Sequence, residues 1–174
     1  MTISRLAAVA AALLFASPVQ AHAPLETWID VTVQADTILL HVIMAPVAAL
    51  RLIDPAAPVR RLTAEDFATQ RPRLMQVGAT LFTLVQLKHR LASRQVEVAL
   101  TEEGDVAYQI IFPRPAPGLL MIDATFLKRL GEGFGGMIDA RDTEGHRLGW
   151  DQLTHDNATL IVMLPNPSLP PKKN

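Results

Sequence analysis

Cysteine is absent from the 174 residues of this chain. No disulfide, thiolate nucleophile or thiolate metal site can therefore form, and burial of apolar side chains must stabilise the fold. Serine is also scarce, since only Ser93 and Ser168 remain after residue 21. Neither serine follows the strand-to-helix pattern of a hydrolase nucleophile. The sequence thus predicts a protein that is not an enzyme, and metal-dependent chemistry is the one catalytic alternative left open.

Two further absences narrow the classes of partner. The formal net charge is only −1, so the chain lacks the basic excess typical of nucleic-acid binding, and no nucleic-acid partner is expected. Long apolar runs are missing as well. The longest one, over residues 6–16, is well short of the roughly 20 residues that a membrane-spanning helix needs.

The first 21 residues have the pattern of a secretory signal peptide. Arg5 precedes the apolar run, and small residues follow it at two possible cleavage positions, after Ala21 or after Ala23. Cleavage after Ala23 would leave proline as the first mature residue, which suits an extended fit in a peptidase poorly. We therefore expect cleavage after Ala21, a periplasmic or secreted protein, and a mature chain of 153 residues.

Most of the mature chain alternates apolar and polar residues, which is the period of a β-strand. Many short strands separated by turns every 8–12 residues predict a mainly β protein, an immunoglobulin-like antiparallel sandwich over residues 22–165. The proline-rich end, residues 166–174, predicts a disordered tail.

The first two strands have a predicted register. Residues 25–34 and 37–46 flank a two-residue gap, and pairing them places one consistently apolar face toward a core. The opposite face carries Trp28, Leu39 and Ile43, and this half-apolar surface should be partly covered. It also suggests packing against a membrane or envelope protein.

One short helical insert, over residues 63–77, is the expected cover. Thr63 as N-cap and Asp66 three residues later form a variant of the capping box. Pro72 interrupts the helical pattern, so we expect a break near residues 70–72. The glycine cluster at 131–136 precedes a strand, and it is interpreted as a flexible turn rather than a phosphate loop.

Histidines offer the remaining metal chemistry. Cleavage after Ala21 would make His22 the N-terminal residue, whose amine and ring nitrogen can chelate Cu(II) or Ni(II) together with a second imidazole. No pair has the close spacing of a zinc site, so the candidates for the second imidazole stay open. The candidate metal ligands are His22, His41, His146 and His155.

Several segments together suggest a family. A leader ending in Ala-His, "WIDVTV", "LTAEDF" and "GLLMIDATFLKRL…GGMIDARDTEGHRLG" resemble the extracytoplasmic N-terminal domain of HupE/UreJ-like membrane proteins, of the hydrogenase and urease accessory type. The resemblance implies an immunoglobulin-type module near a nickel- or cobalt-handling system. This chain has no run long enough for the family's membrane unit, so transport is not carried over. We expect an exported, non-catalytic accessory module that binds copper or nickel through its N-terminal histidine, or alternatively an envelope protein-interaction module without metal.

Overall fold

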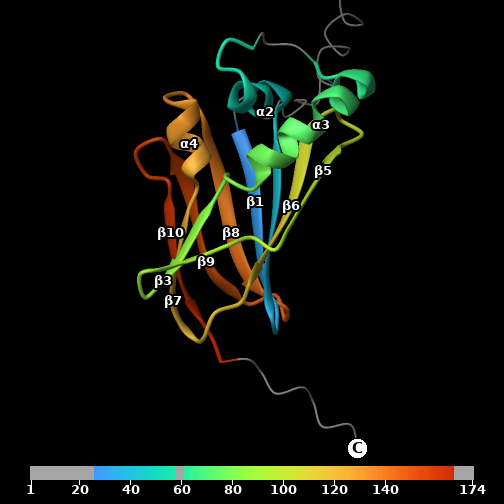
Figure 1. Cartoon of the computed structure of the whole chain (residues 1–174). Helices are drawn as coiled ribbons and strands as arrows, with labels where there is room; N and C mark the ends of the chain where they lie inside the picture. The colour runs from blue at the N-terminus through green and yellow to red at the C-terminus, as the bar shows by residue number, and fades with distance from the viewer. Residues whose placement is uncertain (1–25, 58–60, 167–174) are drawn as a thin grey trace, which may run out of the picture.

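Two β-sheets form the body of the protein. The computed structural model describes residues 26–57 and 61–166, so His22, the predicted leader and residues 167–174 lie outside the described residues (Figure 1). The larger sheet has the strand order β5 (Gln95–Leu100), β6 (Val106–Pro113), β2 (Thr37–Met44), β1 (Glu26–Val33), β8 (Gly135–Asp142) and β9 (Arg147–Thr154). The smaller sheet has the order β10 (Thr159–Leu164), β7 (Gly118–Asp123), β3 (Thr83–Gln86) and β4 (His89–Leu91). The predicted mainly β sandwich is confirmed.

The β1–β2 hairpin has the predicted register. Ile29 pairs with Val42 and Val31 with Leu40, and all four side chains are buried. The N–H of Gln34 donates to the carbonyl oxygen of Thr37 at 2.9 Å and closes the turn. Every strand pair in the described residues is antiparallel except β1 with β8, which run parallel.

The core lies between the two sheets. Inward-facing residues of every long strand contribute to it, and Tyr108 and Phe126 are among its largest fully buried side chains. Burial raises the pKa of the Tyr108 hydroxyl well above its usual value. That hydroxyl has no hydrogen-bond partner among the described residues. The bulk of Tyr108 therefore serves packing, beside Gly78, where an added Cβ would lie 3.0 Å from its ring.

Within residues 26–57 and 61–166, three helices lie near one end of the sandwich, where the sequence predicted one insert (Figure 1). They are α2 (Pro46–Ile53), α3 (Ala64–Gly78) and α4 (Thr125–Leu130). The insert itself is α3, and its predicted capping box is present. Both α2, with eight residues, and α4, with six, are too short for the apolar period of an amphipathic helix to stand out in the sequence.

Two expectations about α3 are wrong. The helix continues through Pro72 without a break. Pro72 has no N–H, so the carbonyl of Ala68 loses its intrahelical hydrogen bond. Both residues are exposed, and water can therefore hydrogen-bond to that carbonyl. The helix also does not cover the face that carries Trp28. It packs on β5 and reaches the core-facing side chains of Val96 and Tyr108 through Gly78.

No helix within the described residues is both long and apolar enough to cross a bilayer.

Candidate functional site

The candidate histidine ligands are spread over the molecule. His41 is half-buried on the outward face of β2, beside Asp30 of β1 and Gln109 of β6. His146 and His155 flank β9 at its two ends. A strand of eight residues is about 26 Å long, so these two histidines cannot bind the same ion. His41 lies on β2, which is three strand spacings, or about 14 Å, from β9. It is therefore also too far to share an ion with a histidine next to β9.

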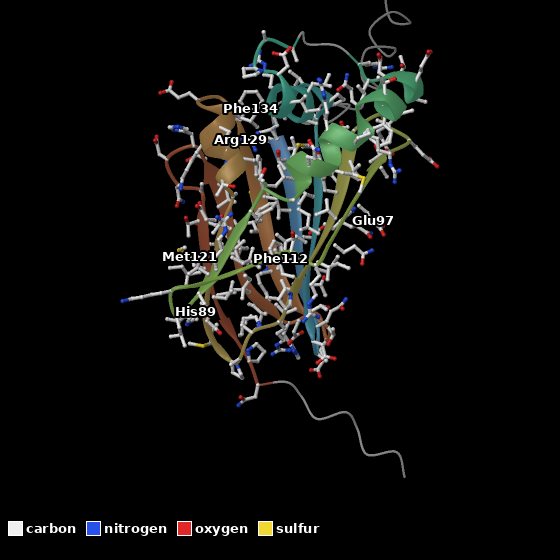
Figure 2. The ribbon with its side chains drawn as sticks, in the orientation of Figure 1. His89, Glu97, Phe112, Met121, Arg129 and Phe134 are labelled. Atoms are coloured by element: carbon white, nitrogen blue, oxygen red, sulfur yellow. The ribbon has the colours of Figure 1, made fainter. Side chains whose placement is uncertain are left out.

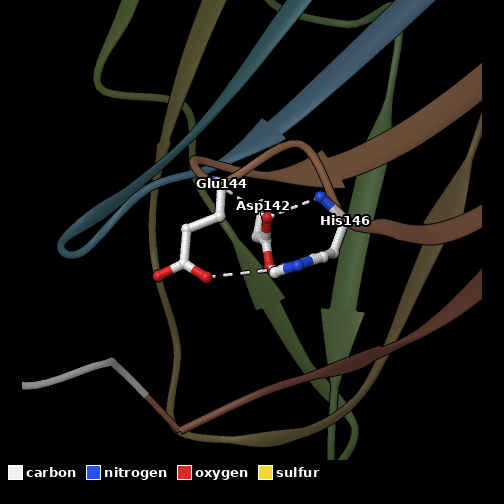
Figure 3. A group of neighbouring side chains, drawn as sticks. All are labelled: Asp142, Glu144 and His146. Carbon is white, nitrogen blue, oxygen red and sulfur yellow. Dashed lines mark hydrogen bonds and ion pairs between the residues drawn. The ribbon is translucent and has the colours of Figure 1, made fainter.

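His146 belongs to a tight cluster in the β8–β9 hairpin (Figure 3). Its Nδ1 lies 3.0 Å from Oδ2 of Asp142 and 3.5 Å from Oε2 of Glu144. One ligand atom from each of the three residues lies within 4.8 Å of the others. Three possible metal ligands lie close together in this cluster. The carboxylate of Asp142, however, already accepts hydrogen bonds from the backbone of the turn.

Asp142 closes that hairpin. Its Oδ1 accepts the backbone N–H groups of Glu144 and His146, each at 2.9 Å. Desolvation raises the pKa of Asp142, but the hydrogen bonds from His146 and Glu144 together outweigh it and hold that pKa below its usual value. All three side chains reach solvent, and the cluster is explained by turn geometry.

His155 lines a cavity of about 540 Å³. The cavity is lined by Glu26 at the start of β1, by the glycine-rich segment 132–136 and by residues 152–156. Nδ1 of His155 is 3.1 Å from Oδ1 of Asp156. A carboxylate on one ring nitrogen leaves Nε2 available, which is how metal-binding histidines are commonly oriented.

The glycine-rich segment is more ordered than a flexible turn. Gly131 and Gly133 adopt positive φ, and Phe134 between them and β8 is buried. Gly135 and Gly136 are already part of β8. The segment is thus an anchored entry to a strand, and it lines the cavity with backbone rather than cradling a phosphate.

A second recess lies on the outer face of the six-stranded sheet. It has a volume of about 340 Å³. We call it the tryptophan hollow; its lining residues are Trp28, Ile29, Asp30, Met137, Ile138, Asp139, Arg147 and Trp150. The strand register explains the grouping, because Trp28 pairs with Met137 across β1 and β8, and Asp139 pairs with Trp150 across β8 and β9.

Both indoles of the hollow reach solvent. Trp28 is 44% exposed and Trp150 57%. The sequence pointed to Trp28 through the half-apolar face of the first hairpin, but it did not single out Trp150. The signal that could have found Trp150 is the alternation of β9, in which Trp150 and Gln152 are exposed and Leu153 is buried.

Asp139 forms ion pairs at the hollow. Asp139 accepts from Arg141 at 2.8 Å and from Arg147 at 3.1 Å. Partial burial raises the pKa of Asp139, but the hydrogen bonds and charges of the two arginines outweigh it, so that pKa is lowered. The guanidinium groups are consequently held in place beside the indoles.

No protein-family model and no curated protein sequence matches the chain. The resemblance to the HupE/UreJ-like domain stays a prediction that rests on the quoted segments alone.

Proposed function

We propose that the protein is an exported, non-catalytic accessory module that binds an envelope protein through the tryptophan hollow. The observation that carries the proposal is the pair of exposed indoles, Trp28 beside Met137 and Trp150 beside Asp139, with arginines fixed by Asp139. Tryptophan and arginine are the residues most enriched among the energetic centres of protein interfaces. Half-buried Leu39 and Ile43 extend the apolar surface on β2.

The chemistry of the hollow selects the class of partner. Carboxylates and guanidinium groups balance there, which favours neither a nucleic acid nor a highly charged surface. Between the strands that carry the two indoles, Met137 of β8 adds an apolar side chain to the lining of the hollow. A partner segment that inserts one aliphatic or aromatic side chain between the indoles fits this arrangement.

Site-specific photocrosslinking in the producing cell tests the proposal. A photoreactive amino acid at position 150 should trap one envelope protein, and the same probe at exposed Ile161 on the other sheet should not. The purified pair should then bind in solution, and Trp150→Ala should weaken that affinity at least tenfold, as expected at an interface centre. The matched control is Ile161→Ala, which should leave the affinity unchanged.

Two outcomes contradict this proposal. One is a crosslinked partner whose purified form binds the wild type and Trp150→Ala equally. The other is competition by soluble oligosaccharides, because paired indoles can also stack on sugar rings.

Metal binding through His22 is a second candidate, and one observation favours His155 as its partner. Glu26 lines the same cavity as His155, and Thr154 lies two strand spacings, roughly 10 Å, from Glu26. The four residues from His22 to Glu26 span at most about 14 Å when extended. His146, at the other end of β9, is beyond that reach.

Titration of the processed protein tests the metal candidate. Mass spectrometry should first show that the mature chain begins at His22. Cu(II) and Ni(II) affinity should then fall at least tenfold in both His22→Ala and His155→Ala, and it should be unchanged in His146→Ala. Equal, weak affinity in all four proteins would end the metal candidate and leave the first proposal intact.

A further inference from the structure

The outer face of the four-stranded sheet exposes aliphatic side chains in adjacent rows. We call it the aliphatic face; its members are Val85, Leu87, Leu119, Met121, Ile161 and Met163. Four of them are large and well exposed: Leu87 at 84%, Ile161 at 63%, Leu119 at 61% and Met163 at 57%.

Strand register makes these residues one patch. Ile161 of β10 pairs with Met121 of β7, which pairs with Val85 of β3. Met163 pairs with Leu119 in the next row. Contiguous exposed apolar surface of this kind is uncommon on a protein that has no partner there.

Leu87 extends the patch at the tip of the β3–β4 hairpin. Leu87 and Lys88 are the two loop residues between the pair Gln86 and His89, and their φ values are +47° and +70°. Such a turn favours Asn-Gly, because an L side chain is strained at positive φ. A large aliphatic residue here is unfavourable both for the turn and for solvation.

The charges without an ion-pair partner at the border of the aliphatic face are cations. Lys88 follows Leu87, and Arg90 pairs with Val85 at the edge of the sheet. Neither side chain forms an ion pair in the part of the chain that the structure describes. Asp123 is the one acidic residue at an outward strand position of this sheet, and Lys128 pairs with it at 3.1 Å.

We infer that the aliphatic face docks on the surface of an anionic lipid bilayer, with Leu87 at the leading tip. Apolar side chains enter the interface between headgroups and acyl chains, while Lys88 and Arg90 remain with the anionic headgroups. The unpaired cations favour this occupant over a second copy of the chain, which would bring like charges together. Figure 2 shows Met121 and His89 on the side of the molecule opposite Glu97, so this face is separate from the outer face of the six-stranded sheet.

Co-sedimentation with vesicles tests the inference. The mature chain should bind vesicles of phosphatidylglycerol and phosphatidylcholine at least tenfold more strongly than vesicles of phosphatidylcholine alone. Added salt should weaken the binding, because the headgroup contribution is electrostatic.

Leu87→Asn separates binding from folding. Asparagine tolerates positive φ, so this variant relieves turn strain while it removes the apolar tip. It should lose at least fivefold in vesicle affinity and remain folded by circular dichroism. Trp150→Ala, on the opposite face, is the matched control and should bind vesicles like the wild type.

Several results would overturn the inference: no preference for anionic vesicles, equal vesicle binding by Leu87→Asn, or loss of vesicle binding in Trp150→Ala. Self-association that Leu87→Asn abolishes, without vesicle binding by the wild type, would identify a second copy as the occupant instead. None of these results bears on the envelope-protein proposal, because the affinity that decides it is measured between two purified proteins without lipid.

Discussion

Across the six-stranded sheet the exposed apolar side chains are mainly aromatic and lie among paired charges, whereas across the four-stranded sheet they are aliphatic and lie beside unpaired cations. Trp28 and Trp150 flank a recess in which Asp139 holds two arginines. Leu119 and Ile161 stand on a face that has no such network. Rigid aromatic groups with fixed hydrogen-bonding partners suit one shaped partner. Aliphatic chains with free cations suit a fluid, anionic surface.

Disrupting the contact between β1 and β8 should disturb the tryptophan hollow and leave the aliphatic face unchanged. An added Cβ at Gly136 would lie 2.5 Å from the carbonyl oxygen of Thr27. Gly136→Val should therefore push the two strands apart, lower the free energy of unfolding by about 3 kcal/mol and disperse the tryptophan hollow. Urea denaturation measures the first effect, and tryptophan fluorescence at zero urea measures the second.

Gly149→Ala is the matched control for that change. Its Cβ would approach side chains and no backbone, Val162 at 3.0 Å and Leu160 at 3.4 Å, and side chains can move aside. The cost should stay below about 1 kcal/mol. Equal destabilisation by the two glycine variants would show that the β1–β8 spacing is not what orders the hollow.

Relieving the turn at the tip of the aliphatic face should stabilise the protein. Leu87→Asn should raise the free energy of unfolding by about 1 kcal/mol, since a non-glycine residue at positive φ costs on the order of 1–3 kcal/mol. Thermal unfolding measures this gain. Leu119→Asn, at an ordinary strand position, should give no gain, and a loss of stability in Leu87→Asn would mean that the turn is not strained.

The smallest expected effect concerns the charge network of the hollow. Asp139→Asn should lower stability by less than about 1 kcal/mol at pH 7, because the ion pairs are partly exposed. The pKa of Asp139 is lowered in the folded protein, so its contribution is full above the unfolded value of about 3.9 and is lost as pH falls through the folded pKa.

Urea denaturation of the two proteins at pH 7 and below about pH 3 checks the sign of that dependence. The difference between wild type and Asp139→Asn should shrink toward zero at the acidic end. A difference that stays constant would mean that asparagine disturbs packing rather than charge.

Much of the architecture follows from local patterns. The register of the first hairpin was predictable because its apolar residues alternate over eight positions, and a slip by one residue would turn Ile29 and Val31 to solvent. The capping box that starts α3 was also predictable from the sequence. The side chains of Thr63 and Asp66 each accept a hydrogen bond from the other residue's backbone N–H, within one helical turn. The continuity of α3 through Pro72 was not readable, because it depends on that side of the helix facing water.

The candidate sites depended far more on tertiary structure. The histidines were visible in the sequence, but only the sheet shows that β9 separates His146 from His155 and that His155 shares a cavity with Glu26. The tryptophan hollow joins residues from β1, β8 and β9, through a parallel pairing of strands more than 100 positions apart.

By itself, the sequence determined the strand period, the first hairpin, the start of the long helix and the limits on catalytic chemistry, because each of these depends on neighbouring residues or on residue types that are missing. Only the tertiary structure decided which outward side chains share a surface. Strand pairing brings distant residues within a few ångströms, and no local pattern records which strands will meet.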